Sequence, residues 1–464
     1  MTLDEIAAVT GGRLVNAESP VVVTGGVEYD SRKVGPGGLF VAFEGEKVDG
    51  HAFAGTAVAA GAAAVLSTRD TGQPGVVVDE PLGALARLAH AVVLRLPELT
   101  VVGLTGSSGK TTTKDYLGQL LGRLGPAVAP AGSLNNELGF PYTVLRATTE
   151  TRFLVLEMGA RGPGHIRYLT EIARPDIGVV LNVGAAHIGE FGSVQGTARA
   201  KGELVEALPA EGVAVLNADD PLVAAMARRT SARVLPVGES ADALIRATEV
   251  VLDEAGRASY LLSTGGQAGK VSLGVPGRHQ VANTLAAAGV ALSAGMPFDD
   301  VVAALGEVGI VSGRRMDVFR RPDGVTVIDD SYNANPSSTA AALRALAAMA
   351  RASRRRTTAV LGYMAELGEY ERSGHEEVGR LAAELGVDRL IAVAENARPI
   401  LDGAARAGGW TGEAIFAPDQ AAAIDIVLGD LRADEVVLVK GSRYRTWDVA
   451  DALRADRRPE EVRP

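Results

Sequence analysis

The chain has 464 residues, of which 47% are hydrophobic and only 4% aromatic, so its cores must be filled mainly by Ala, Val and Leu. Its formal net charge of −10 argues against broad electrostatic binding to nucleic acid or to an anionic membrane. Because cysteine is absent, disulfide bonds, thiolate nucleophiles and cysteine-based metal sites are excluded. At roughly 150 residues per domain, the length predicts about three domains.

The start of the chain and its apolar segments are not typical of a membrane protein. Residues 1–5 lack a basic start followed by an apolar run, so we expect no signal peptide. No uninterrupted apolar stretch is long enough to span a bilayer. We therefore expect a cytoplasmic protein without membrane insertion.

The first block, residues 1–98, is expected to form a small α/β domain, because its apolar patterns are short and separated by turns. The expected elements are a helix over 3–9, extended segments at 21–23 and 39–42, and an alanine-rich helix near 53–60.

The second block, residues 99–311, alternates short apolar runs with helical patterns. Such alternation predicts an α/β domain with a buried parallel sheet. The expected strands are 101–104, 153–156, 177–181 and 213–216. The helices 110–121 and 281–293 are expected on either side of an antiparallel excursion over 250–273.

The third block, residues 312–464, repeats the alternation and predicts a second, doubly wound α/β unit. Its expected strands are 325–328, 358–361, 390–393 and 436–439, separated by helices such as 338–350. The fold class expected for the whole chain is therefore three α/β domains: a small N-terminal one, a central parallel sheet and a C-terminal Rossmann-like sheet.

The strongest functional signal lies between the first strand and the first helix of the second block, where residues 101–112 read VVGLTGSSGKTT. Glycines let backbone N–H groups curl around phosphate oxygens, and the helix start adds positive potential. We expect Lys110 to reach the β and γ phosphates of ATP, and the Thr111 hydroxyl to ligate Mg²⁺. The central sheet is therefore expected to be of the P-loop ATPase type.

Two features qualify this phosphate loop. The strict spacing fails by one residue, because Gly103 precedes the position that is usual for the first glycine. A glycine-rich turn at a strand end, without nucleotide, is the alternative. The residues expected to bind the nucleotide here are Thr105, Gly106, Ser107, Ser108, Gly109, Lys110, Thr111 and Thr112.

The segment TGSSGKTT at 105–112 resembles the phosphate loop of the Mur ligase family, and the resemblance extends over nearly the whole chain. It is carried further by SLNNELGFP at 133–141, LEMGA at 156–160, NVGAAH at 182–187, AKGE at 200–203, DDSYNANP at 329–336 and VKGSR at 439–443. The resemblance implies an ATP-dependent, ADP-forming ligase that activates a carboxylate as an acyl phosphate before an amine attacks it.

The segments at 329–336 and 439–443 are similar to those of the member that adds D-alanyl-D-alanine to UDP-N-acetylmuramoyl-tripeptide. This implies small-molecule substrates and a monomer. It also implies a place in peptidoglycan precursor synthesis, and so in cell-wall biogenesis, cell shape and cell division.

The resemblance implies two Mg²⁺ ions held by Thr111, Glu157, His187 and Lys201. An ammonium would be repelled by Mg²⁺, whereas a carbamate formed from CO₂ and the neutral amine supplies anionic oxygens. We therefore expect Lys201 to be carbamylated. From the residues alone, Glu157 could equally cap a helix, His187 could be structural, and Lys201 could be a solvated surface lysine.

The resemblance also extends the nucleotide site into the third block. Arg315 is expected to reach the γ-phosphate from the domain junction and to act in catalysis with Lys110, Lys201 and His187. Asn283 is a candidate adenine contact, because an amide both donates and accepts along a base edge. Asp330 and Asn333 are expected nucleotide contacts. Without the resemblance, these residues are an exposed arginine, a helix start and a loop.

Substrate-binding residues are expected in all three blocks. Ser31 and Arg32 resemble a uridine-nucleotide-binding turn, and Arg32 could donate to a diphosphate. The others are Asn135, Asn136, Tyr332, Asn335, Lys440, Ser442 and Arg443, of which the last three could hold a peptide carboxylate. The alternative reading of each is a turn or a charged surface loop. A site assembled from three blocks is complete only when the domains close.

Three positions depart from the family pattern: Gln280, Tyr363 and Tyr444. They leave the ATP chemistry intact but bear on the choice of amine. Two alternatives therefore stay open: another amino-acid ligase of the same superfamily, and a P-loop kinase or nucleotide-gated binding protein. The diamino acid of the tripeptide is not determined by the sequence.

Overall fold

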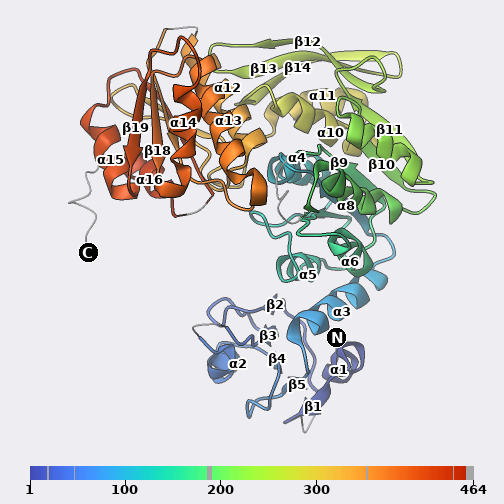
Figure 1. The fold of residues 1–464 in the computed structure, drawn as a ribbon. Helices are drawn as coiled ribbons and strands as arrows, with labels where there is room; N and C mark the ends of the chain where they lie inside the picture. Colours follow the sequence, from blue (N-terminus) through green and yellow to red (C-terminus); the bar gives the residue numbers. More distant parts are fainter. Residues whose placement is uncertain (18–19, 46–47, 185–190, 352–353, 443, 456–464) are drawn as a thin grey trace.

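The computed structural model describes residues 1–464 except 18–19, 46–47, 185–190, 352–353, 443 and 456–464. The chain folds into three α/β units, each built on its own sheet (Figure 1). The N-terminal unit is joined to the central unit through the long helix α3 (Pro81–Leu94). The C-terminal unit lies beside the central unit and apart from the N-terminal unit (Figure 1). The predicted three-part α/β fold is confirmed.

The N-terminal sheet has the order β1-β5-β4-β3-β2, with β1 antiparallel to β5 and the other pairs parallel. Helix α1 starts with a capping box between Thr2 and Glu5, as its sequence favours. The predicted strand at 21–23 is reduced to an isolated bridge between Thr2 and Val22. The elements are α1 (Leu3–Thr10), β1 (Arg13–Val15), β2 (Val27–Glu28), β3 (Leu39–Val41), η1 (Gly50–Phe53), α2 (Ala54–Ala59), β4 (Ala64–Ser67) and β5 (Gly75–Val77).

The central sheet has nine strands in the order β14-β13-β12-β11-β10-β9-β6-β8-β7. The pairs from β7 to β12 are parallel, and β12, β13 and β14 form the predicted antiparallel excursion. The strands are β6 (Thr100–Thr105), β7 (Ala127–Val128), β8 (Phe153–Glu157), β9 (Ile177–Val180), β10 (Val213–Asn217), β11 (Arg233–Gly238), β12 (Ile245–Leu252), β13 (Arg257–Thr264) and β14 (Gln267–Pro276).

Helices cover both faces of the central sheet, so its middle strands are buried on both sides and read as unbroken apolar runs. One face packs against α4 (Lys110–Gly122), α10 (Gln280–Ser293) and α11 (Phe298–Glu307). The other face packs against α5 (Gly139–Val144), α6 (His165–Ile172), α8 (Val194–Glu206), α9 (Pro221–Ala224) and η2 (Ala225–Arg229).

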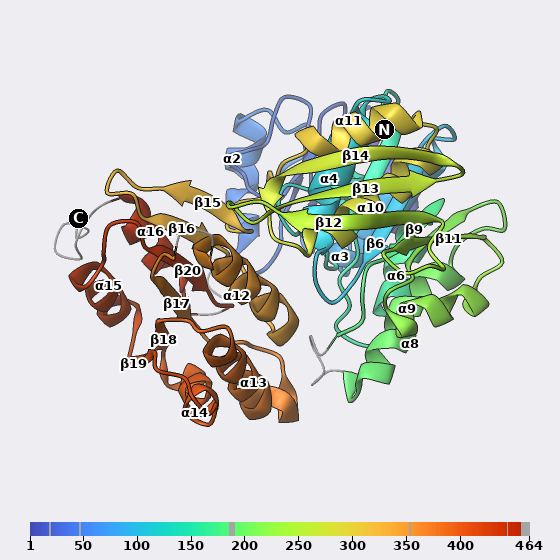
Figure 2. The ribbon, with the colours of Figure 1, turned by 90° about the horizontal axis from the view of Figure 1, so that it is seen from above.

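The C-terminal sheet has the order β15-β16-β20-β17-β18-β19, and all its pairs except β15 with β16 are parallel. Helices α12 to α14 pack on one face and α15 with α16 on the other (Figure 2). This is the predicted doubly wound arrangement. The strands are β15 (Asp317–Arg320), β16 (Thr326–Asp329), β17 (Thr357–Leu361), β18 (Arg389–Val393), β19 (Glu413–Ala417) and β20 (Val436–Lys440). The helices are α12 (Pro336–Arg351), η3 (Gly368–Tyr370), α13 (Glu371–Glu384), η4 (Glu395–Ala397), α14 (Pro399–Ala405), α15 (Gln420–Gly429) and α16 (Trp447–Ala455).

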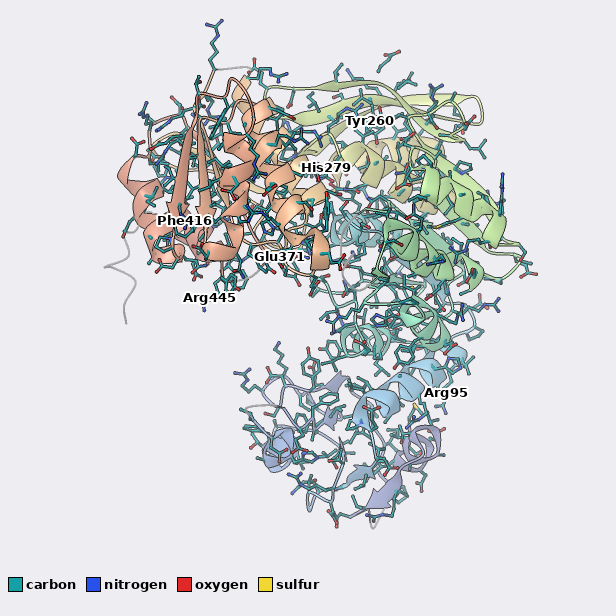
Figure 3. All side chains as sticks on the ribbon, viewed as in Figure 1. Arg95, Tyr260, His279, Glu371, Phe416 and Arg445 are labelled. Carbon is teal, nitrogen blue, oxygen red and sulfur yellow. The ribbon has the colours of Figure 1, made fainter. Side chains whose placement is uncertain are left out.

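The central and C-terminal units meet around His279, which Figure 3 labels at their junction. The pKa of His279 is lowered to about 4, because burial disfavours the imidazolium, although Asp330 opposes the shift and Lys440 adds to it. Two of these groups belong to the C-terminal unit, so the junction is close-packed and polar. Within the described part of the chain, no helix combines the length and apolar character needed to cross a membrane.

The close crossing of α13 and α14 depends on two glycines. A Cβ on Gly379 would lie 1.7 Å from the Ile400 carbonyl oxygen, and one on Gly403 would lie 1.9 Å from the Glu376 carbonyl oxygen. We predict that Gly379→Ala lowers the free energy of unfolding by about 2 kcal/mol, since the helices must separate. For a domain of this size that is roughly 4–8 °C in Tm.

Thermal unfolding followed by circular dichroism measures this difference. The matched control is Gly122→Ala, also in a helix, where the added Cβ meets no atom within 4 Å. An unchanged Tm for Gly379→Ala would show that the two helices are not packed this closely.

Candidate active site

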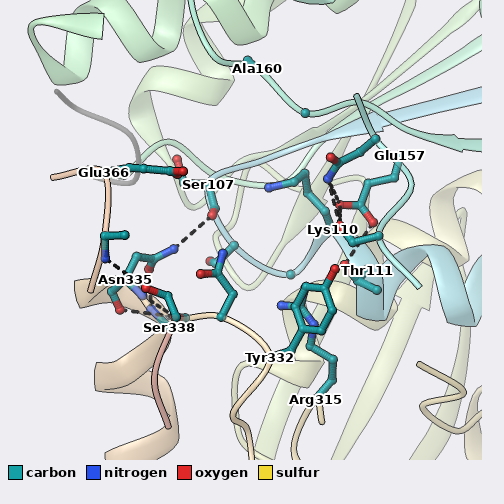
Figure 4. A pocket seen from close by; sticks show the side chains of 18 of the residues that line it. Ser107, Lys110, Thr111, Glu157, Ala160, Arg315, Tyr332, Asn335, Ser338 and Glu366 are labelled. Atoms are coloured by element: carbon teal, nitrogen blue, oxygen red, sulfur yellow. Dashed lines mark hydrogen bonds between the residues drawn. The ribbon is translucent and has the colours of Figure 1, made fainter. Parts of the chain in front are cut away.

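A cavity of about 630 Å³ opens between the carboxyl edge of the central sheet and the loops of the C-terminal unit (Figure 4). Cofactors and substrates of α/β proteins bind beyond this edge of a sheet. Among the residues predicted from the sequence, those that line the cavity are Ser107, Ser108, Gly109, Lys110, Thr111, Thr112, Asn135, Asn136, Glu157, Lys201, Arg315, Tyr332, Asn333, Asn335 and Ser442.

The phosphate loop connects β6 to α4 and is shaped by its glycines. Gly109 has a φ of +79°, where a side chain is strained, and a Cβ there would lie 2.4 Å from Asn283 Oδ1. Lys110 Nζ donates to the carbonyl oxygen of Gly106 at 2.8 Å, so the ammonium folds back over the loop. Burial lowers the pKa of Lys110 and nearby Arg315 lowers it further, whereas Glu157 opposes the shift.

Thr105 and Gly106, the first two residues of the predicted loop, do not line the cavity. The Thr105 hydroxyl, fully buried at the end of β6, donates to the carbonyl oxygen of Met158 at 2.9 Å. Gly106 packs against Leu181, where a Cβ would lie 2.9 Å from the leucine Cβ. These residues shape the loop, and the residues after them face the cavity.

The buried carboxylate of Glu157 lies at the end of β8, beside β6. Its Oε2 accepts a hydrogen bond from the Thr111 hydroxyl at 3.0 Å. Its Oε1 accepts from the Ser133 hydroxyl at 2.8 Å and from Asn135 Nδ2 at 2.6 Å. Hard oxygen donors of this kind suit Mg²⁺, which commonly takes one carboxylate together with phosphate oxygens and water.

No group of three His, Cys, Asp or Glu side chains that could hold a metal ion occurs in the described residues. A single carboxylate and a hydroxyl nevertheless fit a cation that takes its remaining ligands from a nucleotide. The predicted ligand His187 lies outside the described residues.

Lys201 is carried by α8, and its side chain is buried while lining the cavity. Its pKa is well below the ordinary value, because burial penalises the ammonium and Lys110 repels it. Its ammonium makes no hydrogen bond or ion pair with the described residues. Its burial excludes the surface-lysine alternative, and the lowered pKa makes the neutral amine more accessible than in an ordinary lysine.

Arg315 enters the cavity from the segment that joins the central and C-terminal units. Its guanidinium lies 4.2 Å from the centre of the Tyr332 ring, a cation–π contact. In Figure 4 both side chains lie on the side of Thr111 that is opposite Glu157. Arg314 and Met316, on either side of Arg315, have φ angles of 59° and 50°, so the backbone turns sharply there.

Asn335 connects the phosphate loop to the C-terminal unit. Its Nδ2 donates to the carbonyl oxygen of Ser107 at 3.4 Å (Figure 4). Its Oδ1 accepts from the Ser338 backbone N–H at 2.9 Å and so caps the start of α12. One side chain thus caps a helix and contacts the loop expected to bind phosphate.

Asp330 and Lys440 form a buried ion pair under this edge of the C-terminal sheet. Lys440 Nζ also donates to the carbonyl oxygen of Asn333 at 3.0 Å, and Asp330 Oδ1 accepts from the Met316 backbone N–H at 3.1 Å. Neither side chain lines the cavity, so the structure does not bring them to it.

Ser442 lies on the loop after β20 and does line the cavity. Its hydroxyl accepts from the Ala365 backbone N–H at 2.9 Å and donates to the carbonyl oxygen of Tyr363 at 3.0 Å. The Tyr363 and Tyr444 rings, two of the positions that depart from the family pattern, lie 6.0 Å apart beside this loop. The predicted contact Arg443 lies outside the described residues.

Asn283 is buried under the phosphate loop. Its Nδ2 donates to Gln280 Oε1 at 2.9 Å, and the Tyr116 hydroxyl donates to the same oxygen at 3.0 Å. Gln280, which stands where the family has Asn, thereby satisfies two buried donors. Asn136 serves locally as well, because its Oδ1 accepts from the Gly139 backbone N–H at 2.9 Å.

Ser31 and Arg32 lie in the N-terminal unit and do not line the cavity. Arg32 donates from Nε and Nη2 to Asp30, both at 2.8 Å, and this pairing lowers the pKa of Asp30 to about 2. The side chain of Arg32 is 85% exposed, so it remains accessible to a ligand between the units.

Sequence reasoning missed several residues of the site. Asn182 supports the loop, since its Oδ1 accepts from the Ser108 backbone N–H at 2.9 Å and its Nδ2 donates to the Ser108 carbonyl at 3.1 Å. The contacts of Asn182 join positions far apart in the sequence, so no local sequence pattern predicts them. Other cavity residues that were not predicted are Ser133, Arg161, His165, Ser338, Glu366, Arg445 and Trp447.

Family models match most of the chain. Residues 24–98 match the Mur ligase family catalytic domain, residues 104–291 the Mur ligase middle domain, and residues 314–443 the Mur ligase glutamate ligase domain.

Relatives match over the same length. The chain is 47% identical to the UDP-N-acetylmuramoyl-tripeptide–D-alanyl-D-alanine ligase of Mycobacterium tuberculosis, over 100% of this chain and 99% of the relative. It is 36% identical to the ligase of the same name from Escherichia coli, over 86% and 87%.

Solved structures agree. MurF from Acinetobacter baumannii superposes with a TM-score of 0.85 at 31% identity, covering 97% of this chain and 98% of that one. MurF ligase from Thermotoga maritima in complex with ADP gives 0.80 at 29% identity, covering 94% and 98%. With its phosphate loop, its buried Glu157 and these matches along its whole length, the chain belongs to the Mur ligase family.

Proposed function

We propose that the chain is an ATP-dependent, ADP-forming ligase that adds D-alanyl-D-alanine to UDP-N-acetylmuramoyl-tripeptide in peptidoglycan precursor synthesis. The names of the relatives support the substrates. The observation that carries the chemistry is the single cavity in which Lys110, the Thr111–Glu157 pair and Arg315 meet. Cytoplasmic location, a monomeric state and the domain limits 1–98, 99–311 and 312–464 remain predictions.

The reaction requires two anions to approach each other. A carboxylate is a poor electrophile, because oxide would have to leave. Transfer of the γ-phosphoryl group of ATP gives an acyl phosphate, which the amine attacks with departure of phosphate. Such transfer depends on positioning and on neutralising charge, and Lys110 and Arg315 supply cations beside the loop.

Thr111 and Glu157 are the proposed ligands of a first Mg²⁺, which neutralises phosphate charge when bound. Lys201, as a carbamate, and His187 are proposed for a second ion. Burial of Lys201 supports the carbamate, because only the neutral amine reacts with CO₂. The first proposal rests on the hydroxyl and carboxylate oxygens of Thr111 and Glu157, and the second rests on the burial of Lys201 beside the same cavity.

We assign the other predicted binding residues to ligands according to the unit and the loop on which they lie. We place the nucleotide between the phosphate loop and the C-terminal unit, with Asn333 lining its pocket and with Asn283 and Asp330 supporting the pocket from behind. Ser31 and Arg32 would hold the uridine diphosphate on the N-terminal unit. Asn135, Asn136, Tyr332, Asn335, Lys440, Ser442 and Arg443 would surround or support the peptide and the amine.

Replacement of Lys110 tests the phosphate loop. We predict that Lys110→Ala lowers turnover at least a hundredfold, since the cation nearest the transferred phosphoryl group is lost. Phosphate release from ATP in the presence of both substrates measures it. Lys270→Ala, at an exposed position of β14, is the control and should retain wild-type turnover. Full turnover of Lys110→Ala would refute the assignment.

Substrate dependence tests the reaction itself. We predict phosphate release only when the UDP-linked tripeptide and D-alanyl-D-alanine are both present, with a product mass equal to the sum of the two less one water. A panel of tripeptides and amines, read by mass spectrometry, identifies the diamino acid. Product formed with a single amino acid would favour another Mur ligase activity, and release indifferent to the amine would favour a kinase.

Lys201 offers a separate prediction. We expect Lys201→Ala to lose most activity and to recover part of it with a short carboxylic acid, which replaces the carbamate oxygens. ¹³C NMR of wild-type protein in ¹³C-bicarbonate should show a carbamate signal that the variant lacks. Unchanged activity of Lys201→Ala, or identical spectra, would remove the carbamate from the proposal.

A further inference from the structure

Two buried residues of α4, Lys114 and Asp115, bind the segment that joins the central and C-terminal units. Lys114 and Asp115 follow Lys110 by about one helical turn, and their side chains are only 2% and 3% exposed. Lys114 Nζ lies 2.5 Å from Asp115 Oδ1. A buried ion pair is costly unless its remaining hydrogen bonds are satisfied, so its partners are informative.

All but one of those partners belong to the joining segment. Asp115 Oδ2 accepts from the backbone N–H groups of Val311 and Ser312 at 3.0 and 2.8 Å, and Oδ1 accepts from the Ser312 hydroxyl at 3.0 Å. Lys114 Nζ donates to Ser312 Oγ at 3.0 Å and to the carbonyl oxygen of Pro130 at 2.8 Å. Apart from the bond to Pro130, these contacts hold residues 311–312 to the helix.

One helical turn further along α4, Gln119 also binds the joining segment. Gln119 Nε2 donates to the carbonyl oxygen of Gly309 at 2.7 Å, and the Gly309 backbone N–H donates to Gln119 Oε1 at 3.1 Å. Residues 309–312 thus run along α4 and are bound to it by backbone-directed hydrogen bonds. Helix α4 also carries Lys110 and Thr111, so the loop and the joining segment share one rigid element.

Arg315 lies only three residues after Ser312. On its other side, the backbone N–H of Met316 donates to Asp330 at 3.1 Å. Three residues between two anchors span at most about 14 Å, so the backbone of Arg315 has little room to move. Its guanidinium makes a cation–π contact with the Tyr332 ring, and its buried Nε lacks a hydrogen-bond partner among the described residues.

We propose that Asp115, braced by Lys114, is a positioning residue that holds the joining segment against the phosphate-loop helix and so places Arg315 at the phosphates. The inference rests on the proposed ATP-dependent ligase activity and on the assigned role of Arg315. Since no hydrogen bond to a described residue fixes its Nε, the guanidinium of Arg315 depends for its position on its backbone and on Tyr332, and the contacts of residues 309–312 hold that backbone.

Asp115→Asn tests the proposal. We expect kcat to fall about ten- to a hundredfold, as misplacement of a charged group by about 1 Å does, with a KM for ATP within about threefold of wild type. In an Arg315→Ala background the same substitution should have almost no further effect on kcat. Additive effects in this double-mutant cycle would overturn the proposal, because a merely structural Asp115 would act independently of Arg315.

A second variant guards against loss of the fold. Asp115→Asn leaves Lys114 buried without a full countercharge, whereas Lys114→Met with Asp115→Leu replaces the pair by apolar groups, which often preserves stability. This double variant should keep its Tm within a few degrees yet lose kcat, and it decides the matter if the single variant does not fold.

The control is Glu307→Gln, which breaks an exposed ion pair of 2.7 Å between Arg123, the residue just after the same helix, and the end of α11. It should leave kcat unchanged. Wild-type protein without substrate-dependent phosphate release would refute the ligase activity itself. Active wild type with fully active Asp115→Asn would refute only the positioning role.

Discussion

The carboxylate of Glu157 is the constraint on which the site depends. It is buried, and a buried charge is tolerated only when hydrogen bonds or cations surround it. Thr111, Ser133 and Asn135 supply those hydrogen bonds. Through them, the carboxylate fixes the start of α4 and the segment after β7 against the end of β8. The same buried charge is the feature on which the proposed Mg²⁺ site rests.

The C-terminal unit completes this cavity through contacts to the phosphate loop and its helix. Asn335 contacts the loop at Ser107, and Asp115 on α4 binds the segment that leads to Arg315. Both contacts are hydrogen bonds to backbone groups across the junction, so they fix the position of one unit against the other. Phosphoryl transfer relies on preorganised charge more than on reactive side chains, and the two-unit construction provides such preorganisation. The N-terminal unit lies apart from the C-terminal unit (Figure 1), and its Arg32 side chain is exposed.

Local patterns explain which elements were predictable. The strands β6, β8, β9 and β10 are apolar runs because helices bury them on both faces, so their sequence is distinctive. Strand β19 is an edge strand with exposed residues at its start and carries no such run, and it was missed. The segment at 21–23 reads as extended yet pairs only at Val22, because pairing depends on the neighbour that the fold brings to it.

The sequence alone determined the phosphate loop and the three α/β units, because glycine turns and apolar runs are local features, and the family resemblance added the candidates Glu157, Lys201 and Arg315. Only the tertiary structure decided what each polar side chain meets. In the structure Lys440 pairs with Asp330, and Asn182 bonds to Ser108 of the phosphate loop. Ser133 donates to Glu157, and Asp115 accepts from Ser312. These partners are tens to hundreds of residues apart, and which groups share a buried space is fixed by how strands and helices pack.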